Sequence, residues 1–241
     1  MEKTVLFEVK DGIAVITLNR PERHNSFCQD LLVNLYNCID EAAGNPQVRV
    51  AVLTGNGKSF CSGIDLSIIG KENLLDPRGD GKELPDVLGS CKKPIIGAIN
   101  GNAITGGFEL ALNCDFLIAS ENARFIDSHA KVGIHPGWGM TQLLQQAVGR
   151  RMAKQMSFTC KPLSARDALR AGLVNEVVPH AELMPRAMQI AKDICEVNPE
   201  IMHRMKELIE LRDEVSFNEA FRREREGFHD FVRKAKELFG G

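Results

Sequence analysis

Two short glycine-bearing segments, each placed shortly after an apolar run, constrain the fold of this 241-residue chain more than any other feature. The first, residues 60–66 (FCSGIDL), follows the β-branched run 48–53, and the second, residues 101–109 (GNAITGGFE), follows the run 94–99. The apolar runs predict buried strands, and the second glycine segment leads into a helical pattern. Backbone N–H groups at strand-to-helix turns are left without partners, so we expect both turns to present hydrogen-bond donors.

The sequence around these segments predicts alternating strands and helices over the first half of the chain. Residues 5–9 and 13–18 are apolar and flank Asp11-Gly12, a pair typical of a tight hairpin turn. From residue 29 to about residue 44, apolar side chains recur with a helical period. Strand, turn, helix and strand then repeat to about residue 126, which favours ββα or βαβ units with parallel strands.

The second half of the chain, from residue 141, is predicted to be largely helical. Asn198-Pro199, for example, is typical of a helix cap followed by the first helical residue. Ahead of this half, residues 70–84 contain many charged residues and glycines without an apolar period. We expect them to form a surface loop or a short irregular helix over the mouth of a site. The last helices have apolar faces that they cannot bury alone, so we expect them to pack on the core and on another subunit.

Composition and charge exclude several classes of protein. Apolar residues make up 44% and charged residues 26% of the chain, as in an ordinary globular protein. The net charge of -2 gives no reason to expect a nucleic acid or an anionic membrane as a partner. The seven cysteines include no C-x-x-C pair, so we expect reduced thiols and neither a disulfide framework nor a metal site. No apolar stretch approaches membrane-spanning length, and we expect a cytoplasmic protein without a signal peptide.

Both glycine segments resemble motifs of the crotonase superfamily, also called the enoyl-CoA hydratase/isomerase family. The resemblance covers most of the chain in the family's order and spacing, with further matching segments at residues 15–21, 123–125, 133–137, 163–165, 167–168, 171–174 and 226–228. It implies an α/β fold, a crotonase-like spiral of ββα units that gives two packed sheets over residues 1–195. It also implies a helical C-terminal trimerisation segment over residues 196–241.

The resemblance assigns two backbone N–H groups to an oxyanion hole, a pair of donors that stabilises negative charge on a carbonyl oxygen. One belongs to Ile64, after the glycine of the F-x-x-G turn, and the other to Gly106, in a turn where Thr105 replaces the family's first glycine. As an alternative, both segments are ordinary turns that need glycine for a positive φ. Their glycine spacing matches neither a dinucleotide-binding motif nor the phosphate-binding loop of nucleotide hydrolases.

Two side chains stand at the family's catalytic positions. Glu109 matches the first catalytic carboxylate, a base for enolate chemistry, although a glutamate at a helix start can also simply complement the helix dipole. His129 stands twenty residues later, where the family's hydratases have a second glutamate. An imidazole can hydrogen-bond a water molecule, but its charge differs from that of a carboxylate. A purely structural histidine is the alternative, with Asp127 and Ser128 as neighbours that could replace or tune it.

The resemblance also implies how coenzyme A and the acyl group are bound. Five residues match positions near the coenzyme: Arg23, His24, Ser62, Phe231 and Lys234. Lys234 matches a residue that reaches the coenzyme of a neighbouring subunit. Trp138 is a candidate for the acyl pocket and equally for core packing. For the basic loop residues the alternative is simple solvation, and for Phe231 and Lys234 it is an amphipathic terminal helix.

The implied function is that of an enoyl-CoA hydratase-type enzyme, which adds water to an α,β-unsaturated acyl-CoA through an oxyanion-stabilised enolate. A one-base isomerase or decarboxylase of the same family is the first alternative, because it needs the oxyanion hole but not two carboxylates. A catalytically poor acyl-CoA-binding protein is the second. No cofactor is expected beyond the coenzyme A of the substrate, and the expected assembly is a homotrimer or a dimer of trimers.

Overall fold

The computed structural model describes residues 3–239 of the chain. Contacts divide the chain into two units, Met1–Glu196 and Val197–Gly241. The strands are β1 (Val5–Lys10), β2 (Ile13–Leu18), β3 (Val50–Gly55), β4 (Ser59–Cys61), β5 (Ile95–Ile99), β6 (Asn102–Ile104), β7 (Phe116–Ser120), β8 (Arg124–Ile126), β9 (Leu163–Ser164) and β10 (Glu176–Val178). The α-helices are α1 (Gln29–Gly44), α2 (Leu84–Ser90), α3 (Gly106–Leu112), α4 (His129–Val132), α5 (Met140–Thr159), α6 (Ala165–Arg170), α7 (Leu183–Glu196), α8 (Pro199–Glu214) and α9 (Phe217–Phe239).

The first unit contains two sheets. The larger has the strand order β1-β2-β3-β5-β7-β10, and the smaller has the order β4-β6-β8-β9. The predicted hairpin joins β1 to β2 in antiparallel register, with Asp11 and Gly12 both at positive φ (53° and 81°), as a two-residue hairpin turn requires. From β2 to β10 the neighbouring strands of the larger sheet are parallel. The predicted α/β class is confirmed.

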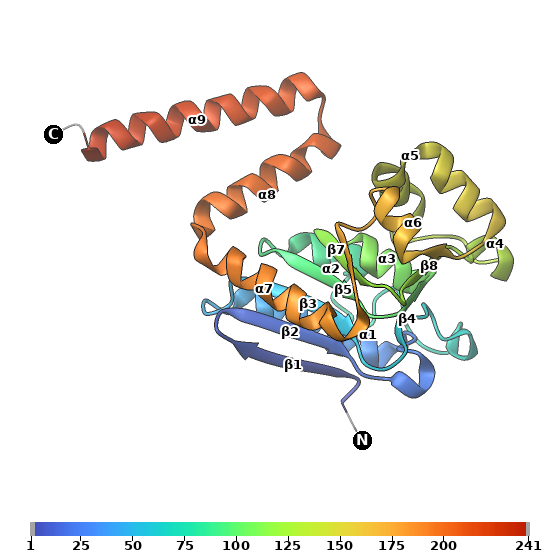
Figure 1. The fold of residues 1–241 in the computed structure, drawn as a ribbon. Coiled ribbons are helices and arrows are strands. Elements are labelled where there is room, and N and C mark those ends of the chain that lie inside the picture. Colours follow the sequence, from blue (N-terminus) through green and yellow to red (C-terminus); the bar gives the residue numbers. More distant parts are fainter. Residues whose placement is uncertain (1–2, 240–241) are drawn as a thin grey trace. The chain divides into compact units, whose positions relative to one another are not determined.

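Helices cover both faces of the larger sheet, which explains why all six residues of β3 are buried. Val50 and Val52 point to one face and pack with Leu183 and Ala187 of α7, which lies across this sheet in Figure 1. Ala51 and Leu53 alternate to the opposite face, in the main core that includes α1 and the smaller sheet. The core therefore has two layers separated by the larger sheet.

The smaller sheet determines where the functional segments meet. Strands β4, β6 and β8 are adjacent and parallel. The carboxyl ends of parallel strands lie at one edge of a sheet, so the segments that follow them come together. These segments are 62–66 after β4, 105–109 after β6 and 127–129 after β8. Residues more than sixty positions apart thus reach one site.

The second unit consists of α8 and α9. The side chain of Asn198 caps α8 by accepting a hydrogen bond from the Ile201 backbone N–H, with Pro199 as the first helical residue, as predicted. Several large apolar side chains of this unit are exposed: Ile201, Met205, Ile209, Phe217, Phe221, Phe228 and Phe231. In the part of the chain that the structure describes, no helix combines the length and the apolar character needed to cross a membrane.

Candidate active site

A cavity of about 90 Å³ lies at the edge where the three parallel strands of the smaller sheet end. All three segments that follow these strands contribute to it, together with part of the chain after α4. The lining residues are Ser62, Ile64, Leu66, Thr105, Gly106, Glu109, Ser128, His129, Val132 and Ile134. The cavity therefore brings together both predicted N–H donors and both predicted catalytic side chains.

The first glycine turn leaves the Ile64 N–H free to point into the cavity. Phe27 lies beside this turn, donating its N–H to Gly63 O (2.8 Å) and accepting from Asp65 N (3.0 Å). Because successive N–H groups of an extended segment point to opposite sides, the N–H of Ile64 points away from Phe27. Gly63, at φ 83°, lets the turn approach the second one, since a Cβ there would lie 3.0 Å from Gly106 N and 2.8 Å from Ile104 O.

The second glycine turn places Gly106 at the start of α3. The carbonyl of Thr105 accepts from Phe108 N and Glu109 N (both 2.9 Å), which leaves the N–H of Gly106 outside this pattern. Thr105 itself has φ 53° and ψ -114°, a conformation that a β-branched residue rarely adopts. Its hydroxyl is hydrogen-bonded to the hydroxyl of Ser128, so this turn is tied to the segment after β8.

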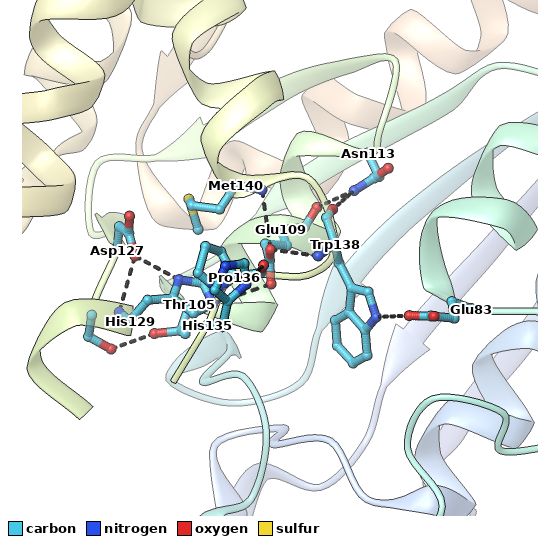
Figure 2. A network of polar contacts seen from close by, with 11 residues as sticks. Glu83, Thr105, Glu109, Asn113, Asp127, His129, His135, Pro136, Trp138 and Met140 are labelled. Carbon is cyan, nitrogen blue, oxygen red and sulfur yellow. Dashed lines mark hydrogen bonds and ion pairs between the residues drawn. The ribbon is translucent and has the colours of Figure 1, made fainter. Parts of the chain in front are cut away.

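Glu109 is held with one carboxylate oxygen engaged and the other facing His129. It is only 2% exposed, and its Oε1 accepts from the backbone N–H groups of Trp138 (2.9 Å) and Met140 (3.2 Å). Its Oε2 lies 3.6 Å from Nε2 of His129. Figure 2 shows Glu109 between the Trp138–Met140 segment and His129. The backbone donors fix the carboxylate, and the second oxygen remains for chemistry.

His129 forms the first residue of α4 and is 6% exposed. Its Nδ1 lies 2.8 Å from Oδ1 of Asp127 (Figure 2). Burial by itself would lower the pKa of His129, but the hydrogen bonds and charges of Asp127 and Glu109 outweigh burial and raise that pKa to about 9. Burial likewise opposes the hydrogen bonds to Asp127, which nevertheless hold its pKa below the usual range. The surroundings of the imidazole therefore favour its protonated form at neutral pH.

The other predicted site residues are distributed over both units. The carbonyl of His24 accepts from Ser62 N (3.1 Å), and its Nδ1 lies 3.3 Å from the hydroxyl of Ser59, which places His24 beside the first glycine turn. Arg23 is exposed next to it. Phe231 and Lys234 are exposed on α9 of the second unit.

Trp138 contributes to the site in a way that the sequence does not indicate. Trp138 is 4% exposed, and its ring packs edge-on against Phe27 with 5.7 Å between the ring centroids. Its Nε1 donates to Glu83 Oε2 at 2.9 Å (Figure 2). Its backbone N–H, rather than its ring, contacts Glu109. The apolar lining comes instead from the side chain of Ile64, which was predicted only as a backbone donor, and from three side chains that the sequence analysis did not single out: Leu66, Val132 and Ile134. The sequence could have indicated two of these lining residues, because Val132 directly precedes the family-matching segment 133–137 and Ile134 lies within it.

Comparisons with known proteins place this chain in a family. The sequence model of the enoyl-CoA hydratase/isomerase family matches residues 8–239. A probable peroxisomal enoyl-CoA hydratase 1 of Arabidopsis thaliana is 39% identical over 100% of this chain and 96% of its own length. A short-chain-enoyl-CoA hydratase of Clostridium acetobutylicum is 38% identical over 93% of this chain and 87% of its own.

Solved structures show the same fold. The enoyl-CoA hydratase of Bacillus anthracis has a TM-score of 0.87 and 31% identity, covering 98% of this chain and 94% of its own. A monofunctional enoyl-CoA isomerase of M. smegmatis has a TM-score of 0.79 and 31% identity, covering 91% and 98%. The crotonase-like fold predicted from the sequence is confirmed, and the chain belongs to the enoyl-CoA hydratase/isomerase family.

Proposed function

We propose that this protein is an enoyl-CoA hydratase that adds water to an α,β-unsaturated acyl-CoA thioester. The observation that supports it best is the position of Glu109, which lines the same cavity as Ile64 and Gly106 and whose Oε2 faces His129 while the backbone donors bind Oε1. Relatives named as enoyl-CoA hydratases match this chain over nearly their whole length. A base and a pair of N–H donors around one cavity suit chemistry through an enolate.

In this mechanism the thioester oxygen accepts hydrogen bonds from the N–H groups of Ile64 and Gly106. As water attacks the β-carbon, electrons move onto the thioester oxygen, and the two donors stabilise the negative charge that develops there. Oε2 of Glu109 takes a proton from the attacking water. His129, 3.6 Å from this oxygen, is close enough for one water molecule to contact both.

A double-bond isomerase is the second candidate, and the identity of residue 129 favours it. Among the described residues that line the cavity, Glu109 is the one with a carboxylate, and Asp127 next to the cavity is paired with His129. A 3-enoyl-CoA isomerase needs one base to move a proton between two carbons and the same oxyanion donors. The M. smegmatis isomerase has a similar fold.

The loss of the conjugated thioester absorbance of crotonyl-CoA tests the hydratase proposal. We expect the wild-type protein to hydrate crotonyl-CoA, and Glu109→Gln to lower the rate by about a hundredfold or more because the proton acceptor is lost. Binding of the substrate should survive, since the N–H donors are untouched. Glu182→Gln, an exposed substitution outside the cavity, is the matched control. Turnover of a 3-enoyl-CoA without hydration of crotonyl-CoA would instead establish the isomerase.

We also propose how the coenzyme is bound. Arg23 and His24 supply positive or hydrogen-bonding groups beside Ser62 at the cavity, and these suit the phosphates of coenzyme A. Phe231 and Lys234 are exposed on α9, and we assign them to the coenzyme of a neighbouring subunit in a homotrimer or a dimer of trimers. The exposed apolar side chains of α8 and α9 support such an assembly.

A further inference from the structure

Asp127 has no role in the reaction proposed above, yet its carboxylate is buried beside the cavity at 3% exposure. Its Oδ1 accepts from the backbone N–H of His129 (3.1 Å) and lies 2.8 Å from Nδ1 of the same residue. Two contacts from one residue to one oxygen fix the orientation of the imidazole. With Nδ1 turned to Asp127, the other ring nitrogen, Nε2, faces Oε2 of Glu109.

The charges around this ring favour its protonated form. The charged groups that act on His129 are Glu109 of α3 and Asp127 after β8. From α5, which packs against α4, the uncharged Ser157 contributes only a hydrogen bond to Asp127. Thr105 and Ser128 add neutral hydroxyls. A neutral imidazole would leave two buried carboxylates, one at each ring nitrogen, without a cation between them, which is costly in a site of low polarity.

We propose that Asp127 is a positioning residue that keeps His129 as an imidazolium aimed at Glu109, and that His129 is the acid that protonates the α-carbon. This inference rests on the hydratase function proposed above. It gives the site a carboxylate and a cationic acid, in place of two carboxylates.

One catalytic cycle returns both side chains to their starting protonation states. The water oxygen bonds to the β-carbon, the double-bond electrons move to form the enolate, and a water proton goes to Oε2 of Glu109. The enolate then collapses, and its α-carbon takes the proton from Nε2 of His129. Finally, the Glu109 carboxyl returns its proton to Nε2 through one water molecule that contacts both groups, because the 3.6 Å between the two atoms is too long for a direct hydrogen bond. The net change is the addition of one water molecule, with both side chains restored.

Asp127→Asn tests the positioning role, because it keeps the shape of the side chain and removes its charge. The rate of crotonyl-CoA hydration should fall more than tenfold at pH 8 and less than threefold at pH 6. The wild-type rate should fall only as the pH rises through about 9. In Asp127→Asn this fall in rate should occur at lower pH, closer to 6.5, the ordinary pKa of histidine. Asp193→Asn, exposed on α7, is the control with unchanged rates. An equal loss at every pH would overturn the inference, because it would indicate a purely structural role.

Nitrogen NMR of the histidine rings in the substrate-free protein tests the same inference without measuring catalysis. His129→Gln identifies the signal of His129 among the six histidines. The inference predicts that the wild-type ring stays doubly protonated until the pH approaches 9, and loses this proton at lower pH in Asp127→Asn. A wild-type ring that titrates near pH 6.5 would overturn it, even if Asp127→Asn did not fold. If the ring behaves as predicted but crotonyl-CoA is not hydrated, the positioning role stands and the hydratase proposal fails.

Discussion

Thr105 has a backbone conformation that is unfavourable for its β-branched side chain. Its φ of 53° and ψ of -114° suit glycine, and a β-branched side chain at this point is strained. The hydrogen bond between its hydroxyl and Ser128 joins the turn that presents Gly106 to the segment that presents His129. We infer that the strain is tolerated because this link holds the two segments together.

Two substitutions separate the strain at Thr105 from its hydrogen bond. Thr105→Ala and Thr105→Gly both remove the hydroxyl, but only alanine retains a Cβ at positive φ. We therefore expect the glycine variant to be more stable than the alanine variant by about 1 kcal/mol, measured by chemical denaturation. Equal stability of the two would show that the backbone at this position is unstrained.

At the level of residues, the sequence could predict which side chains meet but not how they are oriented. Glu109 and His129 could be placed together because both match catalytic positions of the family, and in the structure each follows a short parallel strand of one sheet. The pairing of Asp127 with His129 depends on rotamers and burial, which leave no trace in residue spacing. The same holds for Trp138, whose backbone N–H contacts Glu109 while its ring packs on Phe27.

At the level of elements, close packing between the two glycine turns decides the shape of the site. Helix α3 begins against strand β4 so closely that a Cβ on Gly107 would lie 2.1 Å from Cys61 O. Only glycine permits this approach, and the contact positions the first turn of α3, where Glu109 stands. Long periodic elements such as α1 were predictable, whereas β9 and β10, of two and three residues, depend on pairing with β8 and β7.

Gly107→Ala should destabilise the protein strongly, because the added methyl group overlaps backbone that cannot shift without disturbing β4. We expect a loss of more than about 2 kcal/mol of unfolding free energy, the range observed for overpacking of a tight core. Gly89→Ala in α2 is the matched control, since nothing lies within 4 Å of its added Cβ. It should be neutral or stabilise the protein by up to about 1 kcal/mol. Similar unfolding curves for both variants would contradict this account of the α3–β4 contact.

At the level of the whole molecule, the two units bury apolar surface very differently. The first has a core in two layers, whereas α9 exposes Phe217, Phe221, Phe228 and Phe231. In water, a helix with such a face is stabilised when another surface covers it. The apolar spacing of this helix was visible in the sequence, but its covering partner was not, because contacts between chains have no signature in residue periodicity.

Light scattering at micromolar concentration tests the proposed assembly. We expect a mass three or six times the 26.6 kDa of one chain. Phe228→Ala should shift the mass toward that of the monomer, because it removes apolar area from the exposed face of α9. Arg233→Ala alters an exposed charged residue of the same helix, paired with Asp230, and should leave the mass unchanged. A stable wild-type monomer would contradict the assembly, and with it the role of Lys234 at a neighbouring subunit.

Trp138 provides an intrinsic fluorescence signal from the candidate active site. It is the single tryptophan of the chain, and its indole N–H is bound by Glu83 while its backbone is bound by Glu109. Indole fluorescence responds to the polarity and charge around the ring, so a ligand that displaces either glutamate changes the emission of one known side chain. Substrate binding can thus be measured by intrinsic fluorescence without a label, even in variants that have no catalytic activity.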